Sequence, residues 1–173
     1  MKKFFLTAAC FAVMTSGAFA ATTSIPEDSV EFNGHHYFLF DDVALKWDDA
    51  KKYCEERGGH LATITSEDEE IFLKDLVSEH GEKNSYWLGG YVNKIGMWNW
   101  ITGEKFSYTN WGAGQPDNYL GKEDVLMMYR NPNPMNPSSS PLGAWNDIRR
   151  DGTCNHEPFF GTENIGLLCE WDE

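Results

Sequence analysis

The stretch ALKWDDAKKYCEERGGHLATITSEDEE, residues 44–70, begins with a helix signal that has a sharp end. Trp47, Ala50 and Cys54 stand at i, i+3 and i+7, which places them on one face of a helix. The Gly58–Gly59 pair follows, and glycine commonly ends a helix because it adopts the left-handed conformation at no steric cost. This half of the stretch therefore predicts a short helix with one apolar face.

The other half of the stretch contains the start of a second helix. Ser66, with Glu69 three residues later, predicts a capping box, in which two residues satisfy each other's backbone N–H groups at a helix N-terminus. The apolar residues Ile71, Phe72 and Leu76 follow. Two consecutive helices are therefore expected early in the chain.

Short segments rich in aromatic and apolar residues predict the strands, and most of them come after the helices. They are residues 35–42, 86–92, 97–103, 123–129, 144–148 and 165–172. Because the strands do not alternate with the helices, the pattern indicates the α+β class rather than a repeat of βαβ units. The tryptophans expected in the core are Trp47, Trp87, Trp98, Trp100 and Trp111.

The first twenty residues have the layout of a secretory signal peptide. Lys2 and Lys3 precede an apolar stretch that ends in small residues, with cleavage predicted after Ala20. A lipoprotein signal acylated at Cys10 fits less well, because Thr7 stands where a branched apolar residue is wanted. The apolar run is too short to span a bilayer. We therefore expect a secreted or periplasmic protein without a transmembrane segment.

The remaining chain is long enough for one domain with a real core. Residues 21–31 are predicted to be a polar leader and residues 32–173 the domain. The formal net charge is -13, and loss of the signal with its two lysines makes it more negative still. Such a surface repels phosphate backbones and anionic lipids, so a nucleic-acid partner is not expected.

Two polar segments, GQPDNYLGKED (114–124) and LGAWNDI (142–148), concentrate oxygen-bearing side chains. The candidate ligands are Gln115, Asp117, Glu123, Asn146 and Asp147. Mixed carboxylates and amides suit a hard cation, and calcium before magnesium, because calcium tolerates irregular shells of six to eight oxygens. Zinc would favour histidine or thiolate. The histidines at 35, 36, 60, 80 and 156 show no metal-binding spacing.

The order of these motifs resembles the C-type lectin-like domain from about Tyr37 to Trp171. The matching motifs are WDDAKKYC, GGHLATITSEDEE, WLGG, YTNW, QPD, WND and GLLCEW. The resemblance implies a small antiparallel sheet flanked by two helices, with long loops on top and neighbouring termini. It also implies a disulfide between Cys54 and Cys169, each of which lies in strongly patterned sequence.

For the loops, the resemblance implies a Ca²⁺ ion held by the five candidate side chains and by the backbone carbonyl of Asp147. Two vicinal sugar hydroxyls would complete the shell, and the Gln115–Pro116 bond is expected to be cis. The QPD form of the loop is associated with galactose and N-acetylgalactosamine, whereas the Glu-Pro-Asn form is associated with mannose or glucose. Tyr119 stands where galactose-type members carry an aromatic residue that packs on the sugar.

Other family features are missing from this sequence. The usual second disulfide needs a cysteine where Val125 stands, so Cys154 has no inherited partner, and a free thiol and an intermolecular bond that makes an oligomer both stay open. Only Asn118 and Asp124 remain as candidates for a second calcium site, which we expect to be absent or weak.

Two irregular segments, residues 130–143 and 149–164, are predicted to be loop insertions near the calcium site. They allow a second interpretation, a protein-binding module in which calcium only braces the loops. An enzyme is disfavoured, because the acids are committed to one ion and no nucleophile or phosphate-binding motif is present.

Overall fold

The structure, a computed structural model, describes residues 25–154 and 159–172. The predicted signal peptide and the start of the leader lie outside these residues. The helices are α1 (Trp47–Glu55) and α2 (Glu67–His80). The strands are β1 (Val30–Phe32), β2 (His35–Phe40), β3 (His60–Leu61), β4 (Ser85–Val92), β5 (Trp98–Trp100), β6 (Val125–Tyr129), β7 (Trp145–Ile148) and β8 (Ile165–Asp172). Short 3-10 turns cover Tyr119–Gly121 and Thr162–Asn164.

The strands form one sheet in the order β1-β2-β8-β4-β6-β7, with β3 added to β8 and β5 to β4. The predicted antiparallel sheet is correct at every named strand pair but one, since β4 and β8 run parallel. The sequence also missed β1 and β3, which are only two or three residues long. The sheet begins at Val30, inside the segment expected to be leader.

Among the described residues, no helix has the length and apolar character needed to cross a bilayer.

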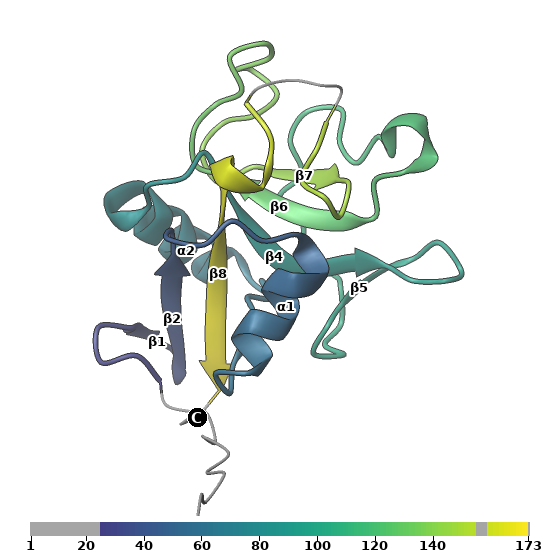
Figure 1. The fold of residues 1–173 in the computed structure, drawn as a ribbon. Coiled ribbons are helices and arrows are strands. Elements are labelled where there is room, and N and C mark those ends of the chain that lie inside the picture. The colour runs from purple at the N-terminus through teal and green to yellow at the C-terminus, as the bar shows by residue number, and fades with distance from the viewer. Residues whose placement is uncertain (1–24, 155–158, 173) are drawn as a thin grey trace, which may run out of the picture.

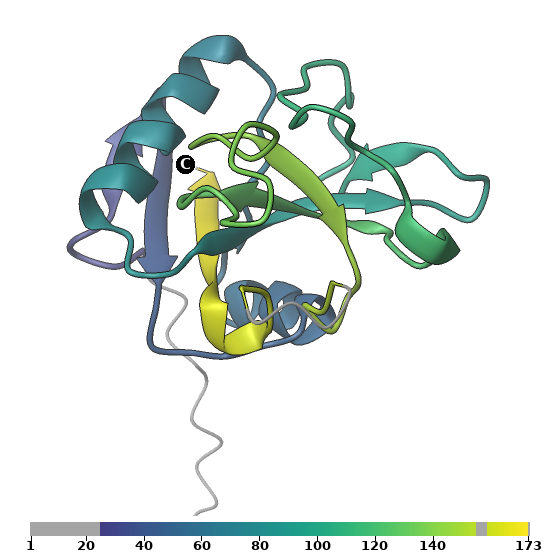
Figure 2. The ribbon, with the colours of Figure 1, turned by 90° about the horizontal axis from the view of Figure 1, so that it is seen from above.

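Alternation along the strands gives the sheet two apolar faces, each covered by one helix. Leu167 and Cys169 of β8 pack in the cluster that contains α1, whereas Leu168 packs in the cluster that contains α2. This is the period of two expected for a strand buried on both faces. The view from above shows the two helices on opposite sides of the sheet (Figure 2). The predicted α+β architecture with two flanking helices is therefore confirmed.

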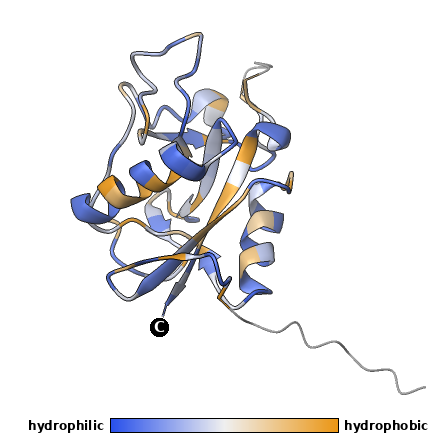
Figure 3. Ribbon diagram, turned by 90° about the vertical axis from the view of Figure 1, so that its left-hand side faces the viewer, coloured by the Kyte–Doolittle hydropathy of each residue, from blue (hydrophilic) through white to orange (hydrophobic). Residues whose placement is uncertain are grey.

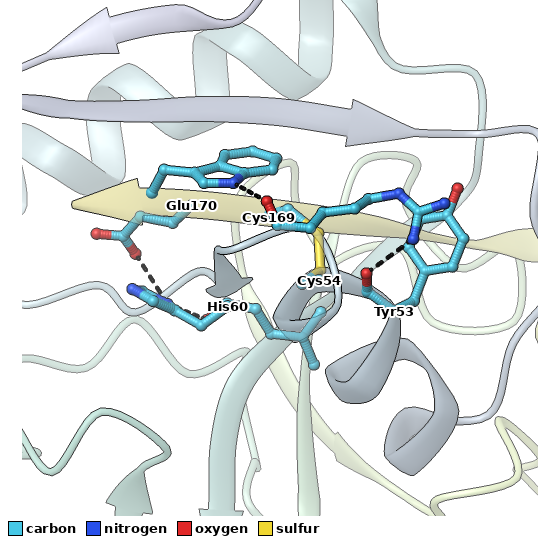
Figure 4. Close-up of a disulfide and its surroundings, with 8 residues drawn as sticks. Tyr53, Cys54, His60, Cys169 and Glu170 are labelled. Carbon is cyan, nitrogen blue, oxygen red and sulfur yellow. Dashed lines mark hydrogen bonds and ion pairs between the residues drawn. A yellow bond between two sulfur atoms is a disulfide. The ribbon is translucent and has the colours of Figure 1, made fainter. Parts of the chain in front are cut away.

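Helix α1 is fixed to the sheet by its apolar face. The indole Nε1 of buried Trp47 donates to the Leu88 carbonyl of β4 at 2.8 Å. At the other end of the helix, Cys54 forms the predicted disulfide with Cys169 of β8 (Figure 4). Gly58 follows with a φ of 82°, which explains the glycine there.

Helix α2 confirms half of the predicted capping box. The Ser66 hydroxyl accepts from the Glu69 backbone N–H at 3.2 Å, but the Glu69 carboxylate accepts from the N–H of Thr65 rather than from that of Ser66. The buried face of the helix contains Leu73, Leu76 and Val77. Figure 3 shows this helix in front, with both hydrophobic residues (orange) and hydrophilic residues (blue) along its length. Ile71, an apolar residue of the same helix, is 45% exposed.

The upper part of the molecule consists of β6, β7 and long loops (Figure 1). Its centre is the buried Trp145, which packs edge-on against neighbouring aromatic rings that include Trp100 and Trp111. The Trp145 indole donates to the Glu70 carboxylate of α2 at 2.8 Å. Burial of that carboxyl raises its pKa to about 7. All five expected core tryptophans are packed in the core, Trp98 and Trp111 at its half-buried margin.

Candidate functional site

Strand β7 carries the second half of the candidate site. Asn146 and Asp147 lie in the middle of this strand, opposite Met127 and Leu126 of β6, and both side chains are buried. A strand buried on both sides is usually apolar, so two polar side chains there need partners. For Asp147, those partners come from the loop that carries the QPD motif.

The side-chain carboxylate of Asp147 binds backbone N–H groups of the QPD loop. Its Oδ1 accepts from the N–H of Asp117 at 3.1 Å, and its Oδ2 accepts from the N–H of Asn118 at 2.7 Å. The loop is closed a second time where the Glu123 carboxylate accepts from the N–H of Tyr119 at 3.1 Å. The peptide bond between Gln115 and Pro116 is cis, as expected. The two sequence segments therefore meet through charge-assisted hydrogen bonds.

Three carboxylates converge where these segments meet. One oxygen each of Asp117, Glu123 and Asp147 lies within 4.8 Å of the other two. Glu123 is 3% and Asp147 1% exposed, whereas Asp117 is open to solvent. None of the three forms a salt bridge with a basic side chain in the described part of the chain. This cluster therefore lacks a positive charge of its own.

Two buried oxygen atoms indicate which kind of ligand the cluster can bind. Glu123 Oε1 and Asn146 Oδ1 have no hydrogen-bond partner among the described residues. A buried acceptor without a partner costs free energy, so native structures rarely keep one without a reason. The donor set of carboxylates and an amide fits a hard divalent cation such as calcium.

The pKa values of two carboxyl groups in this cluster are raised. Burial, together with the nearby charges of Asp147 and Asp117, raises the pKa of Glu123 to about 7, against the Tyr119 N–H bond that lowers it. Burial also raises the pKa of Asp147. Both shifts mean that ionisation of these carboxyl groups is less favourable than in water, and that a nearby cation would favour it.

Gln115 and Tyr119 complete the predicted set. The Gln115 carbonyl oxygen accepts from the Asp117 N–H at 3.1 Å, which leaves its amide N–H₂ directed away from that bond. Tyr119 is 39% exposed and lines a cavity beside the carboxylate cluster. Each of the six predicted ligand-binding residues therefore either lines the cavity or belongs to the carboxylate cluster.

The cavity has a volume of about 210 Å³, and part of its wall comes from the segment 130–143. The wall residues that the sequence did not assign to the site are Tyr129, Asn133, Met135, Asn136, Ser139, Ser140, Cys154 and Phe160. Apart from Tyr129, they lie in the two predicted insertions, and the irregular composition of these segments was the signal for them, because a loop without periodicity does not reveal which side chains face a cavity.

The two candidates for a second calcium site have other partners. Asp124 accepts from the Arg150 guanidinium at 2.9 Å, and Arg150 also pairs with Asp48. Asn118 accepts from the Glu123 N–H at 3.2 Å. A carboxylate neutralised by arginine is a poor cation ligand.

Two of the histidines meet acidic side chains in the fold. The sequence shows no metal-binding spacing of histidines, and the fold places His35 and His60 beside the same two carboxylates, Glu170 and Asp172. The signal is absent from linear spacing because the four residues come from three strands.

A mixed sheet between two helices, with acidic loops at one end, is the C-type lectin fold. Residues 43–157 match the Lectin C-type domain, and the chain belongs to this family of carbohydrate-binding, non-enzymatic domains. The C-type carbohydrate-recognition domain of cow CD23, in a structure with GlcNAc2Man3 oligosaccharide, matches with a TM-score of 0.65 at 26% identity. That match covers 87% of this chain and 97% of the CD23 domain.

Two curated relatives extend the comparison. Mouse C-type lectin domain family 4 member G is 31% identical over 135 residues, 73% of this chain and 40% of that protein. Galactose-specific lectin nattectin of Thalassophryne nattereri is 36% identical over 105 residues, 60% of this chain and 65% of nattectin. The chain thus matches about two fifths to two thirds of the length of these relatives.

Proposed function

We propose that this protein is an exported, calcium-dependent lectin with a preference for terminal galactose or N-acetylgalactosamine. The observation that carries the proposal is the convergence of the Asp117, Glu123 and Asp147 carboxylates beside the unpartnered oxygens of Glu123 and Asn146. Calcium held there would exchange its waters for two vicinal sugar hydroxyls. Gln115, Asp117, Glu123, Asn146 and Asp147 are the proposed ligands.

The side chains around the ion would orient the sugar. Carboxylate oxygens accept hydrogen bonds from sugar hydroxyls, and the amides of Gln115 and Asn146 donate to them. The position of the amide donor decides which pair of hydroxyls fits, so Gln115 and Asp117 in this order favour the galactose arrangement. Tyr119 offers an exposed ring for the apolar face of galactose. The galactose-specific relative nattectin supports this choice.

Export rests on the amino-terminal sequence. The predicted signal peptide, with cleavage after Ala20, leads to secretion or the periplasm. The disulfide between Cys54 and Cys169 supports an oxidising compartment.

The test is calorimetry on the oxidised mature protein after removal of metal. Calcium should bind with a Kd of about 10⁻⁴–10⁻³ M, the range of extracellular modules. Galactose should then bind only with calcium present and more tightly than mannose, and a chelator should reverse the binding. Equal binding of both sugars would reject the galactose preference.

A second candidate function follows from the cavity wall. Residues 130–143 line the cavity beside the carboxylates, and Met135 in this segment is 77% exposed. These loops suit a protein partner, with calcium only bracing them. If a broad glycan array stays blank while calcium still raises the melting temperature, the lectin function is wrong and the protein-binding function gains support.

A further inference from the structure

A group of two imidazoles and two carboxylates lies at the end of the sheet remote from the upper loops. His35 of β2 pairs with Asp172 of β8, and His60 of β3 pairs with Glu170 of β8. Residues 170 and 172 of a strand share one face, and their directly paired neighbours share that face with them. The register of three strands therefore brings all four side chains to one side of the sheet.

One donor atom each of His35, Glu170 and Asp172 lies within 4.8 Å of the other two, close enough to share one ion. His35 Nδ1 lies 2.9 Å from Glu170 Oε1 and 2.9 Å from Asp172 Oδ1. His60 Nε2 lies 3.6 Å from the other oxygen of Asp172. Tetrahedral ligands about 2.1 Å from a zinc ion are roughly 3.4 Å from one another, so the donors of His35, Glu170 and Asp172 require only small shifts, whereas His60 has to move toward them to become a fourth ligand. Figure 4 shows His60 beside Glu170.

The hydrogen bonds leave both imidazoles with an unused ring nitrogen. His35 Nδ1 is buried between two carboxylate oxygens, yet it makes no hydrogen bond with suitable geometry among the described residues. The Nδ1 of His60 lies 3.0 Å from the Leu61 carbonyl, and its buried Nε2 likewise has no partner in the described chain. A ring whose first nitrogen donates to a backbone carbonyl presents the lone pair of the second, which is how metal-binding histidines are oriented.

Glu170 is held in place before any ion arrives. It is 2% exposed, and its Oε2 accepts from the Thr63 backbone N–H at 2.9 Å. Its Oε1 lies 3.4 Å from the Tyr37 hydroxyl. A polar cavity of about 110 Å³, lined in part by His35 and Glu170, adjoins the group. The exposed carboxylate of Asp172 leaves the outer side open to solvent.

We propose that His35, Glu170 and Asp172 form a binding site for a transition-metal ion of the zinc type, and that His60 moves toward them as the fourth ligand. Two nitrogen and two oxygen ligands suit zinc, whereas calcium and magnesium prefer oxygen alone. The ion would join β2, β3 and β8 at the lower end of the domain. This site shares no residue with the proposed calcium site, so the two proposals stand or fall separately.

The first experiment uses the oxidised mature protein in saturating calcium, which keeps the upper site occupied. Zinc should bind with one equivalent in calorimetry and raise the melting temperature as its concentration rises. Cobalt, as a spectroscopic substitute, should give the intense visible absorption of a four-coordinate complex. The weak spectrum of six-coordinate cobalt would overturn the proposed site, and this result needs no variant.

The second experiment assigns the ligands. His35→Ala and His60→Ala should each weaken zinc binding at least tenfold, since loss of even an outer-shell partner of a ligand has an effect of about this size. His36→Ala is the matched control, because His36 is adjacent on β2 but faces the other side and contacts Ser29. Asp147→Ala should leave zinc binding unchanged. Circular dichroism confirms that each variant is folded.

The competing explanation is a pH-sensitive ion-pair cluster, in which protonated imidazoles neutralise the two carboxylates. It predicts that zinc binds below one equivalent, or that both histidine variants bind zinc as tightly as His36→Ala. Either result overturns the metal site.

Discussion

Asp147 on strand β7 accepts a hydrogen bond of 2.7 Å from the backbone N–H of Asn118, which lies in the loop after the QPD motif. This bond joins two segments separated by the whole of β6 and the irregular loop 130–143. The same carboxylate belongs to the cluster with Asp117 and Glu123. Asp147 therefore shapes the loop and is a proposed ligand at once.

Asp147→Asn should abolish calcium binding under conditions that saturate the wild type. The substitution removes one of three clustered charges and places an amide N–H₂ against a backbone N–H, so the loop loses an acceptor. Calcium titration followed by intrinsic fluorescence measures the loss. Glu67→Gln, which removes a charge in the first turn of α2, is the control. Wild-type calcium affinity in Asp147→Asn would refute the ligand assignment.

The double substitution Gln115→Glu with Asp117→Asn should retain calcium and change the preferred sugar from galactose to mannose. One carboxylate and one amide are kept, but the amide donor moves to the other position. Competition between the two sugars on an immobilised ligand measures the preference. If galactose is still preferred and calcium is still bound, the donor-placement argument is wrong.

Tyr119→Ala should weaken galactose binding by about 0.5–1.5 kcal/mol, the value of an aromatic contact beyond its buried area. Calcium affinity should not change, because the hydrogen bond from Tyr119 to Glu123 comes from the backbone N–H, which alanine keeps. The adjacent Leu120, 68% exposed, provides the control Leu120→Ala. Equal galactose affinity in both variants would exclude stacking on Tyr119.

Calcium affinity should fall roughly tenfold between about pH 8 and about pH 6, as one-proton linkage requires for a ligand with this pKa. The pKa of Glu123 in the calcium-free protein is raised from 4.5 to about 7, and calcium needs the ionised form. For the same reason, the calcium-free fold should lose stability as pH rises from 4.5 toward 7, because the folded state then binds the proton more tightly than the unfolded state. Calorimetry and thermal unfolding across pH test both signs. A pH-independent calcium affinity would contradict this prediction.

Removal of the disulfide by Cys54→Ala with Cys169→Ala should lower the free energy of unfolding by roughly 4–5 kcal/mol in the chain-entropy model. The bond closes a loop with a sequence separation of 115 residues, which restricts the unfolded chain strongly. Urea denaturation of the double variant measures the loss, with Cys154→Ala as control. A change below about 1 kcal/mol would show that the unfolded state is already compact.

Local signals in the sequence determined the two helices, the later strands and the motifs of the upper loops. Helix α1 follows from the spacing of Trp47, Ala50 and Cys54, and the start of α2 follows from Ser66. These features depend on residues within one or two turns of one another, so periodicity and capping reveal them. The family motifs added the partner of Cys54, which spacing alone left unassigned.

Only the tertiary structure decided the parallel pairing of β4 with β8, the wall of the cavity and the meeting of His35 and His60 with Glu170 and Asp172. Strand register is set by packing between distant segments, and a shift of one residue would turn each side chain to the opposite face. A site made of donors from several strands or loops therefore exists only once the chain has folded. The sequence contains the ligands, and the fold determines the distances between them.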